Sequence, residues 1–305
     1  MKVGVNILNF GPGVGPDALL RWAQIAETLG YHSVMISDHV AITPSVRQRY
    51  PEPYYDTFTT LAWLAGQTRK VLLGTTVCVL PYRHPILTAR LTANLDQLSG
   101  GRLIFGVGVG NARDEFEALS LPYERRGRMA NECLAAILAL WSGNSSVSFK
   151  GRLISFGDVS GSAPLQQPHP PIWVGGASEG ALKRAVVYGQ AWHPIIRSMA
   201  AVRDQALPDL RRTAETQGRP MPAFCPRIRL DLHDRAIAVG ERLPGSGTLD
   251  QVRGDLEELA ALGAEHVNLD WFTGDLEATR DHERGWRMLA TMAEKVLDLS
   301  RETLR

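Results

Sequence analysis

The chain has 305 residues, and its 33 basic side chains nearly balance its 32 acidic ones, for a formal net charge of +1. This balance gives no general attraction to nucleic acid or to an anionic membrane surface. Hydrophobic residues make up 44% of the chain and charged residues 21%, which is the composition of an ordinary globular protein rather than a disordered one.

The spacing of the cysteines and the hydropathy of the chain bear on where in the cell the protein is expected. Cys78, Cys133 and Cys225 are odd in number and far apart, which argues against a disulfide framework and against a zinc knuckle. No stretch approaches the roughly 18 consecutive apolar residues that a membrane span needs. The first apolar run, at 2–8, is too short for a signal peptide and is followed by glycine and proline. We expect a cytoplasmic protein that binds neither nucleic acid nor membrane.

Short apolar runs alternate with stretches of helical periodicity along the chain. Strands are predicted at 2–8, 33–37, 71–79, 103–107, 172–174, 190–193, 227–232 and 266–269. Helices are predicted at about 17–29, 56–68, 85–98, 129–141, 179–188, 200–216, 249–262 and 283–304. Residues 145–165 predict a hairpin insertion before the fifth strand.

Eight strands that alternate with helices through right-handed crossovers predict an α/β fold. The expected architecture is a single (β/α)8 TIM barrel with loop insertions, spanning residues 1–305. A doubly wound parallel sheet is the alternative. Most strands are too short and too continuously apolar for a one-sided antiparallel sheet.

Two glycine-bearing segments follow predicted strands and precede predicted helices: Gly106-Val-Gly-Val-Gly-Asn111 and Ile172-Trp-Val-Gly-Gly-Ala-Ser178. Without Cβ atoms in the way, their backbone N–H groups can face an anion at a helix N-terminus. A phosphorylated cofactor is therefore the leading hypothesis for this pair of segments. The alternative is that the glycines only form tight turns between strand and helix.

Asp38 and His39 end the second predicted strand, at the edge where the loops of a barrel build the active site. A histidine there can exchange a proton near neutral pH. The alternative is that Asp38 caps the following turn while His39 lies on the rim.

Other site types lack their motifs. The histidines show no metal-ligand spacing and the first strand has no His-x-His pair, so we predict no metal site. The sequence also has no Gly-Lys-Ser/Thr phosphate loop and no Gly-x-Gly-x-x-Gly fingerprint.

Several motifs together resemble the bacterial luciferase-like superfamily, and the resemblance spans most of the chain. They are Ser37-Asp-His39, Leu73-Gly-Thr-Thr-Val77, Leu98-Ser-Gly-Gly-Arg102, Gly106-Val-Gly-Val-Gly110, Pro171-Ile-Trp-Val-Gly-Gly176 and Trp192-His-Pro194. The resemblance implies a TIM barrel that uses either reduced flavin mononucleotide (FMN) for monooxygenation or the deazaflavin coenzyme F420 for hydride transfer. The Asp-His pair is more similar to the deazaflavin branch, which implies an F420-dependent oxidoreductase acting on a small organic substrate.

The same resemblance implies roles for individual residues. His39 would be the catalytic proton partner, and a non-prolyl cis peptide between Thr76 and Val77 would form a bulge behind the flavin-type ring. The further cofactor-binding residues would be Asp38 beside His39, Gly108, Val109, Gly110 and Asn111 along the ribityl chain, and Gly175, Gly176, Ala177 and Ser178 around the phosphate.

Two departures from similar sugar-phosphate dehydrogenases argue against glucose 6-phosphate as the substrate. Asn111 stands where those enzymes have an acid, and no tryptophan follows the Asp-His pair. The predicted lid carries Tyr50, Tyr54 and Tyr55, which favours a less polar substrate. The alternatives are a two-component monooxygenase that uses reduced FMN from a reductase partner, and a non-catalytic cofactor-binding protein. The resemblance also implies a homodimer.

Overall fold

A computed structural model describes residues 1–238 and 240–305. Its central feature is a curled parallel sheet with the strand order β10-β9-β8-β5-β3-β2-β1-β14-β11, in which β4 also pairs with β5. The strands are β1 (Lys2–Asn6), β2 (Ser33–Ile36), β3 (Leu72–Thr75), β4 (Cys78–Val79), β5 (Leu103–Gly108), β8 (Ile172–Gly175), β9 (Ala191–His193), β10 (Ala223–Phe224), β11 (Arg227–Arg229) and β14 (His266–Asp270).

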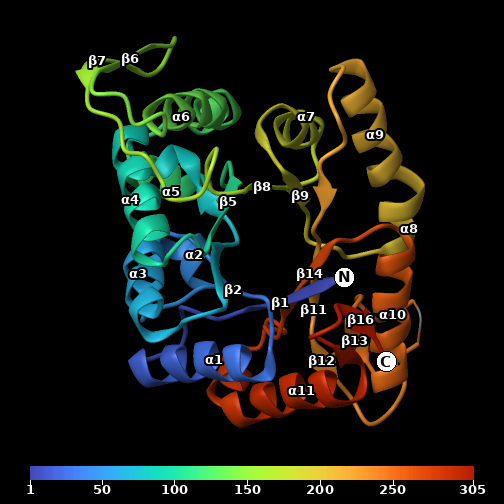
Figure 1. Cartoon of the computed structure of the whole chain (residues 1–305). Coiled ribbons are helices and arrows are strands. Elements are labelled where there is room, and N and C mark those ends of the chain that lie inside the picture. The colour runs from blue at the N-terminus through green and yellow to red at the C-terminus, as the bar shows by residue number, and fades with distance from the viewer. Residues whose placement is uncertain (239) are drawn as a thin grey trace.

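Helices form an outer layer around these strands (Figure 1). The longer ones are α1 (Pro16–Leu29), α3 (Thr57–Gln67), α4 (Pro85–Leu98), α6 (Arg126–Leu140), α7 (Glu179–Tyr188), α9 (Leu207–Thr216), α10 (Leu249–Ala261) and α11 (His282–Lys295). In β2 every residue is buried, because one face of the sheet packs on helices and the other faces the interior.

The two ends of the sheet order lie next to each other in the sequence. Only Cys225 and Pro226 separate β10 from β11, and Pro226 has no N–H group for a continuous ladder. The backbone N–H of Cys225 bonds to the carbonyl of Trp192 in β9, while the carbonyl of Pro226 accepts from Asn268 in β14. Residues 223–229 therefore contact both β9 and β14.

Local sequence signals placed many elements correctly. The predicted helices at 85–98 and 179–188 have the bounds of α4 and α7. The predicted insertion is confirmed as an antiparallel hairpin of β6 (Val147–Lys150) and β7 (Ser155–Val159), which projects from the rest of the molecule in Figure 1. Within residues 1–238 and 240–305, no helix combines the length and the apolar character needed to cross a bilayer.

Three predicted elements were wrong in extent. The third strand stops at Thr75 and resumes at Cys78. The strand predicted at 227–232 ends at Arg229, and β12 (Asp231–Leu232) leaves the sheet to pair with β13 (Ser246–Gly247). The helix predicted to reach residue 304 ends at Lys295, and β15 (Leu297–Asp298) and β16 (Thr303–Leu304) form a hairpin around a turn in which Asp298 accepts hydrogen bonds.

Several short helices were not predicted. They are α2 (Pro44–Arg47), α5 (Arg113–Ala118) and the 3-10 turns η1 (Leu80–Tyr82), η2 (Tyr123–Arg125) and η4 (Glu277–Arg280). The helix predicted at 200–216 is a continuous run of α8 (Met199–Ala201), the π-helical turn η3 (Val202–Ala206) and α9.

Candidate functional site

A cavity of about 300 Å³ opens at the carboxyl ends of the parallel strands. Both glycine segments and the Asp-His pair reach it, as expected for strand ends that meet at one edge of a curled sheet. Ten of the twelve residues predicted for the site line this cavity: Asp38, His39, Thr76, Val77, Gly108, Val109, Gly110, Asn111, Gly175 and Gly176.

Ala177 and Ser178 lie just outside it. Ala177 lines a separate cavity of about 510 Å³ next to α7 and α9. Ser178 is the N-cap of α7, and its hydroxyl accepts a hydrogen bond from the backbone N–H of Ala181. Both residues therefore lie at the N-terminus of a helix, where backbone N–H groups favour an anion.

His39 is held by a carboxylate that the sequence did not point to. Its Nδ1 lies 2.7 Å from Oε2 of Glu115, a fully buried side chain in α5. The other oxygen, Oε1, accepts from the backbone N–H groups of Val40 and Ala41. The hydroxyl of Tyr82 donates to Oε2 at 2.9 Å.

These contacts fix the charge of Glu115 and the tautomer of His39. Burial acts to raise the pKa of Glu115, but hydrogen bonding with His39, the charge of His39 and the backbone N–H groups lower that pKa below its ordinary value of 4.5. An ionised carboxylate only accepts hydrogen bonds, so the proton between the two groups belongs to Nδ1 of His39. The other ring nitrogen, Nε2, makes no hydrogen bond to the residues that the structure describes, and His39 lines the cavity.

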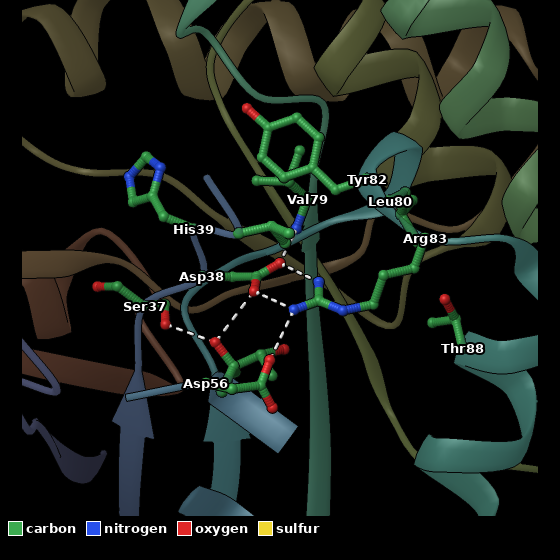
Figure 2. Close-up of polar contacts among 12 residues, drawn as sticks. Ser37, Asp38, His39, Asp56, Val79, Leu80, Tyr82, Arg83 and Thr88 are labelled. Carbon is green, nitrogen blue, oxygen red and sulfur yellow. Dashed lines mark hydrogen bonds and ion pairs between the residues drawn. The ribbon is translucent and has the colours of Figure 1, made fainter. Parts of the chain in front are cut away.

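Asp38 has a different environment from its neighbour. Its buried carboxylate forms a two-pronged ion pair with Arg83, with both N–O distances at 2.8 Å. It also accepts from the hydroxyl of Thr57 and from the backbone N–H of Val79. Figure 2 shows this convergence, with the ring of His39 pointing away from it. Asp38 therefore fixes the wall of the cavity, and its oxygens are already engaged.

The peptide between Thr76 and Val77 is cis, as the resemblance predicted. Behind it, the hydroxyl of Thr76 lies 2.9 Å from Nε2 of His193, whose Nδ1 bonds to the carbonyl of Cys225. Since a carbonyl only accepts, Nδ1 of His193 carries the proton and Nε2 accepts from Thr76. Burial is the main cause that lowers the pKa of His193 to about 4, so this imidazole is neutral.

Arg227 brings a positive charge to the floor of the cavity. Its guanidinium donates to the carbonyl and the hydroxyl of Thr76 and pairs with Asp270 at 2.5 Å. Asp270 also accepts from the side-chain amide of Asn6. The bulge, the arginine and the first strand are thus joined in one polar network.

The glycine wall fits a flat cofactor ring. A Cβ atom on Gly108 would lie 2.5 Å from Cγ2 of Val77, and one on Gly175 would lie 3.0 Å from Cγ1 of the same residue. Side chains at these positions would crowd Val77, so glycine keeps both flanks of Val77 free of side chains. The residues present therefore suit a planar, ring-bearing cofactor.

Sequence reasoning missed four polar side chains of the site: Tyr82, Arg83, Glu115 and Arg227. Glu115 had a local signal, since the run Arg113-Asp-Glu-Phe-Glu-Ala118 has the acidic first turn of a short helix. Arg227 was visible as one of the charged residues that alternate with apolar ones in the predicted strand at 227–232. Arg83 and Tyr82 have no local signal, because only the folded chain brings them to Asp38 and Glu115.

The chain is similar to curated proteins with two kinds of chemistry. It is 33% identical over 176 residues to the oxygenase component of the flavin-dependent trigonelline monooxygenase of Acinetobacter baylyi. This alignment covers 57% of this chain and 46% of that protein. It is 33% identical over 212 residues to the F420-dependent glucose-6-phosphate dehydrogenase of Kineococcus radiotolerans, with coverages of 67% and 60%. The aligned part is less than two thirds of either relative.

A solved structure and a family description agree with the motifs. The monooxygenase RslO1 of Streptomyces bottropensis superposes with a TM-score of 0.78 and 25% identity, over 96% of this chain and 98% of that one. The protein family described as "Luciferase-like monooxygenase" matches residues 1–241, which is most of the sequence. The chain therefore belongs to the luciferase-like monooxygenase family.

Proposed function

We propose that this protein is an oxidoreductase that transfers a hydride between coenzyme F420 and a small organic substrate. The observation that supports this most is the pair of His39 and Glu115 at the wall of a glycine-lined cavity. The dehydrogenase from Kineococcus has this type of cofactor by name. Glu115, four positions after Asn111, gives His39 a buried carboxylate partner, which supports a catalytic role for His39 over the non-catalytic alternative.

The cofactor would lie against Val77, with Gly108, Val109 and Gly110 on one flank and Gly175 on the other. Its phosphate would lie at the N-terminus of α7, near Gly176, Ala177 and Ser178, with Asn111 on the exposed side. When bound, a deazaflavin supplies or accepts a hydride, whereas a flavin also activates oxygen.

The protein's own residues would move the proton that accompanies hydride transfer. Glu115 keeps a proton on Nδ1 of His39, so Nε2 is the nitrogen that faces the cavity and exchanges a proton with the substrate oxygen. Tyr82 holds the same carboxylate oxygen from the other side. Asp38 and Arg83 position the loop that carries His39.

The architecture proposed for this site is a closed (β/α)8 barrel formed by residues 1–305 as one domain. The contacts of residues 223–229 with β9 and β14 support closure, because they join the two ends of the sheet order. We also propose that the protein acts in the cytoplasm as a homodimer.

A second candidate function is an FMN-dependent monooxygenase working with a reductase partner. The full-length structural match to RslO1 and the likeness to the trigonelline monooxygenase favour it. The two candidates share the cavity and differ in the cofactor that the cavity selects.

Cofactor titration separates the candidates. Purified protein is titrated with F420 and, separately, with FMN in both redox states, with binding followed by cofactor fluorescence or absorbance. We expect F420 to bind at least about tenfold more tightly than FMN, a difference of about 1.4 kcal/mol. Tight binding of FMN without binding of F420 would favour the monooxygenase, and binding of neither would contradict both candidates.

Paired glycine variants locate the bound cofactor. Gly108→Val places a side chain against Val77 and should abolish binding, whereas Gly254→Ala, in α10 with nothing within 4 Å, should leave it unchanged. Thermal unfolding of both variants shows whether lost binding reflects lost structure.

A further inference from the structure

A second cavity adjoins the cofactor cavity at the same end of the sheet. It has a volume of about 290 Å³ and shares Arg49, Asp270 and Phe272 with its neighbour. Arg197 and Arg229 also line it. Three arginines thus line a space that shares part of its wall with the cavity of His39.

The sequence of β11 explains how a cationic side chain comes to this place. In Arg227-Ile-Arg-Leu230, Ile228 and Leu230 are buried, while the two arginines are partly exposed. Side chains alternate between the faces of a strand, so both arginines lie on the face toward the cavities. Arg229 pairs in register with Asp270 of β14.

The positive charge of this second cavity is not neutralised by the described residues around it. Asp270 is the acidic residue of its lining, and its carboxylate is engaged by Arg227 and Asn6. Within 1–238 and 240–305, neither Arg49, Arg197 nor Arg229 forms an ion pair, and Arg229 donates only to the carbonyl of Thr273. Guanidinium groups that lie close together without a negatively charged partner favour the binding of an anion.

The wall between the two cavities is aromatic. Phe272 lines both cavities, and Tyr50 lines the one that contains His39. Their ring centroids are 6.4 Å apart, and the ring of Tyr50 is 4.9 Å from that of His39. A flat apolar group would fit beside these rings, with its polar end toward the arginines.

We propose that the substrate is an organic oxyanion, a carboxylate or a phosphate ester carried on a flat apolar body. The anionic end would be bound by Arg197 and Arg229, with Arg49 closing over it from the lid, and the body would lie between the aromatic wall and His39. This inference rests on the proposed function for the role of His39, but the arginine site itself does not depend on which cofactor is bound. It adds a charged end to the less polar substrate that the tyrosines of the predicted lid favour.

Matched small probes test the charge requirement. Binding of benzoate, phenyl phosphate and the neutral benzamide is measured by calorimetry or ligand-observed NMR, with and without bound cofactor. We expect both anions to bind at least about tenfold more tightly than benzamide, which corresponds to a charge-assisted hydrogen bond of about 1.4 kcal/mol. Their binding should weaken as salt is raised, because ions screen exposed charges. Equal affinity for benzoate and benzamide would overturn the proposal, and a preference between the two anions identifies the class of oxyanion.

Charge-matched variants place the anion. Arg197 is exposed, so Arg197→Gln should fold normally and weaken benzoate binding by about tenfold. Arg229→Gln should do the same, and Arg128→Gln, which removes an exposed arginine outside both cavities, should have no effect. If Arg197→Gln instead weakens F420 or FMN and spares benzoate, the arginines serve the cofactor and the inference is wrong. Benzoate binding without cofactor binding would contradict the proposed function alone, and cofactor binding without benzoate binding would contradict this inference alone.

Discussion

At the scale of single residues, the chemistry of the cavity depends on which nitrogen of His39 carries a proton. Glu115 decides this, because an ionised carboxylate 2.7 Å from Nδ1 must accept from it. The carboxylate is in turn held by two backbone N–H groups and by Tyr82. Glu115 is thus a positioning residue, and His39 is the residue that faces the cavity.

Glu115→Gln should change the tautomer of His39 and lower stability at neutral pH. The amide keeps the shape of the side chain but loses the charge-assisted hydrogen bonds, which costs about 2 kcal/mol. Imidazole ¹⁵N shifts should show a single Nδ1–H tautomer in the wild type and a mixture in the variant. Glu117→Gln, an exposed change in the same helix, should alter neither.

The stability difference should depend on pH in a defined direction. The pKa of Glu115 is lowered by folding, so its contribution is fully present above pH 4.5 and is lost as pH falls toward the folded pKa. Urea unfolding at pH 7 and at decreasing pH below 4.5 should therefore show the wild type approaching the variant. A gap between wild type and Glu115→Gln that stays constant at acid pH would contradict the assignment of an ionised carboxylate.

At the scale of elements, Asp38 joins segments that are separate in the sequence. It follows β2, accepts from the first residue of α3 and from β4, and pairs with Arg83 after η1. Arg83 reaches further to Asp56, the N-cap of α3. The loop that presents His39 is therefore anchored at its base by a buried ion pair (Figure 2).

Arg83→Met should destabilise the protein strongly. It leaves the buried carboxylate of Asp38 without its cation, and breaking a buried pair in this way costs about 3 to 5 kcal/mol. Arg113→Met breaks the exposed pair with Glu124 and should change the free energy of unfolding far less, because solvent screens that pair. Urea unfolding curves of the two variants measure both values. Equal, small losses would mean that Asp38 is solvated and not anchored by Arg83.

Elements with local signals were predictable from the sequence, and those set by distant contacts were not. The bounds of α4 follow from Pro85 at its first turn and glycines after its end, which are local features. In contrast, the departure of β12 from the sheet depends on pairing with β13, which lies fourteen or more residues further along the chain. The same holds for the site. Ten predicted positions, in the glycine segments, the bulge and the Asp-His pair, line one cavity. Glu115 and Arg83 were not predicted, because only the folded chain brings them to His39 and Asp38.

At the scale of the whole molecule, neutral histidines hold the interior together. His193 and His266 are both almost fully buried, and the ring of Trp173 lies 5.4 Å from the first and 5.0 Å from the second. His193 links the bulge at Thr76 to the carbonyl of Cys225, and His266 bonds to Ser33 of β2. Strands far apart in the sequence are thus linked by hydrogen bonds to buried imidazoles, which are stable there only in the neutral form.

This arrangement should make the fold sensitive to mild acid. Burial is the main cause that lowers the pKa of His193 from 6.5 to about 4, and it lowers the pKa of His266 well below 6.5, with the charges of neighbouring histidines adding to the effect. The unfolded chain therefore binds more protons than the folded one between pH 6.5 and 4, and the free energy of unfolding falls as pH falls through that interval. From His193 alone the loss is about 2 kcal/mol at pH 5 and about 3 kcal/mol at pH 4.

His193→Gln should reduce this acid sensitivity, because an amide at that position can still bond to Thr76 and carries no group that titrates. Urea unfolding at pH 7, 6 and 5 should give a shallower fall in stability for the variant than for the wild type, even if the variant starts less stable. His233→Asn, which removes an exposed imidazole, should keep the wild-type slope. Equal stability of the wild type at pH 7 and pH 5 would mean that the two histidines are protonated as easily in the folded chain as in the unfolded one. It would contradict the conclusion that burial keeps His193 and His266 neutral.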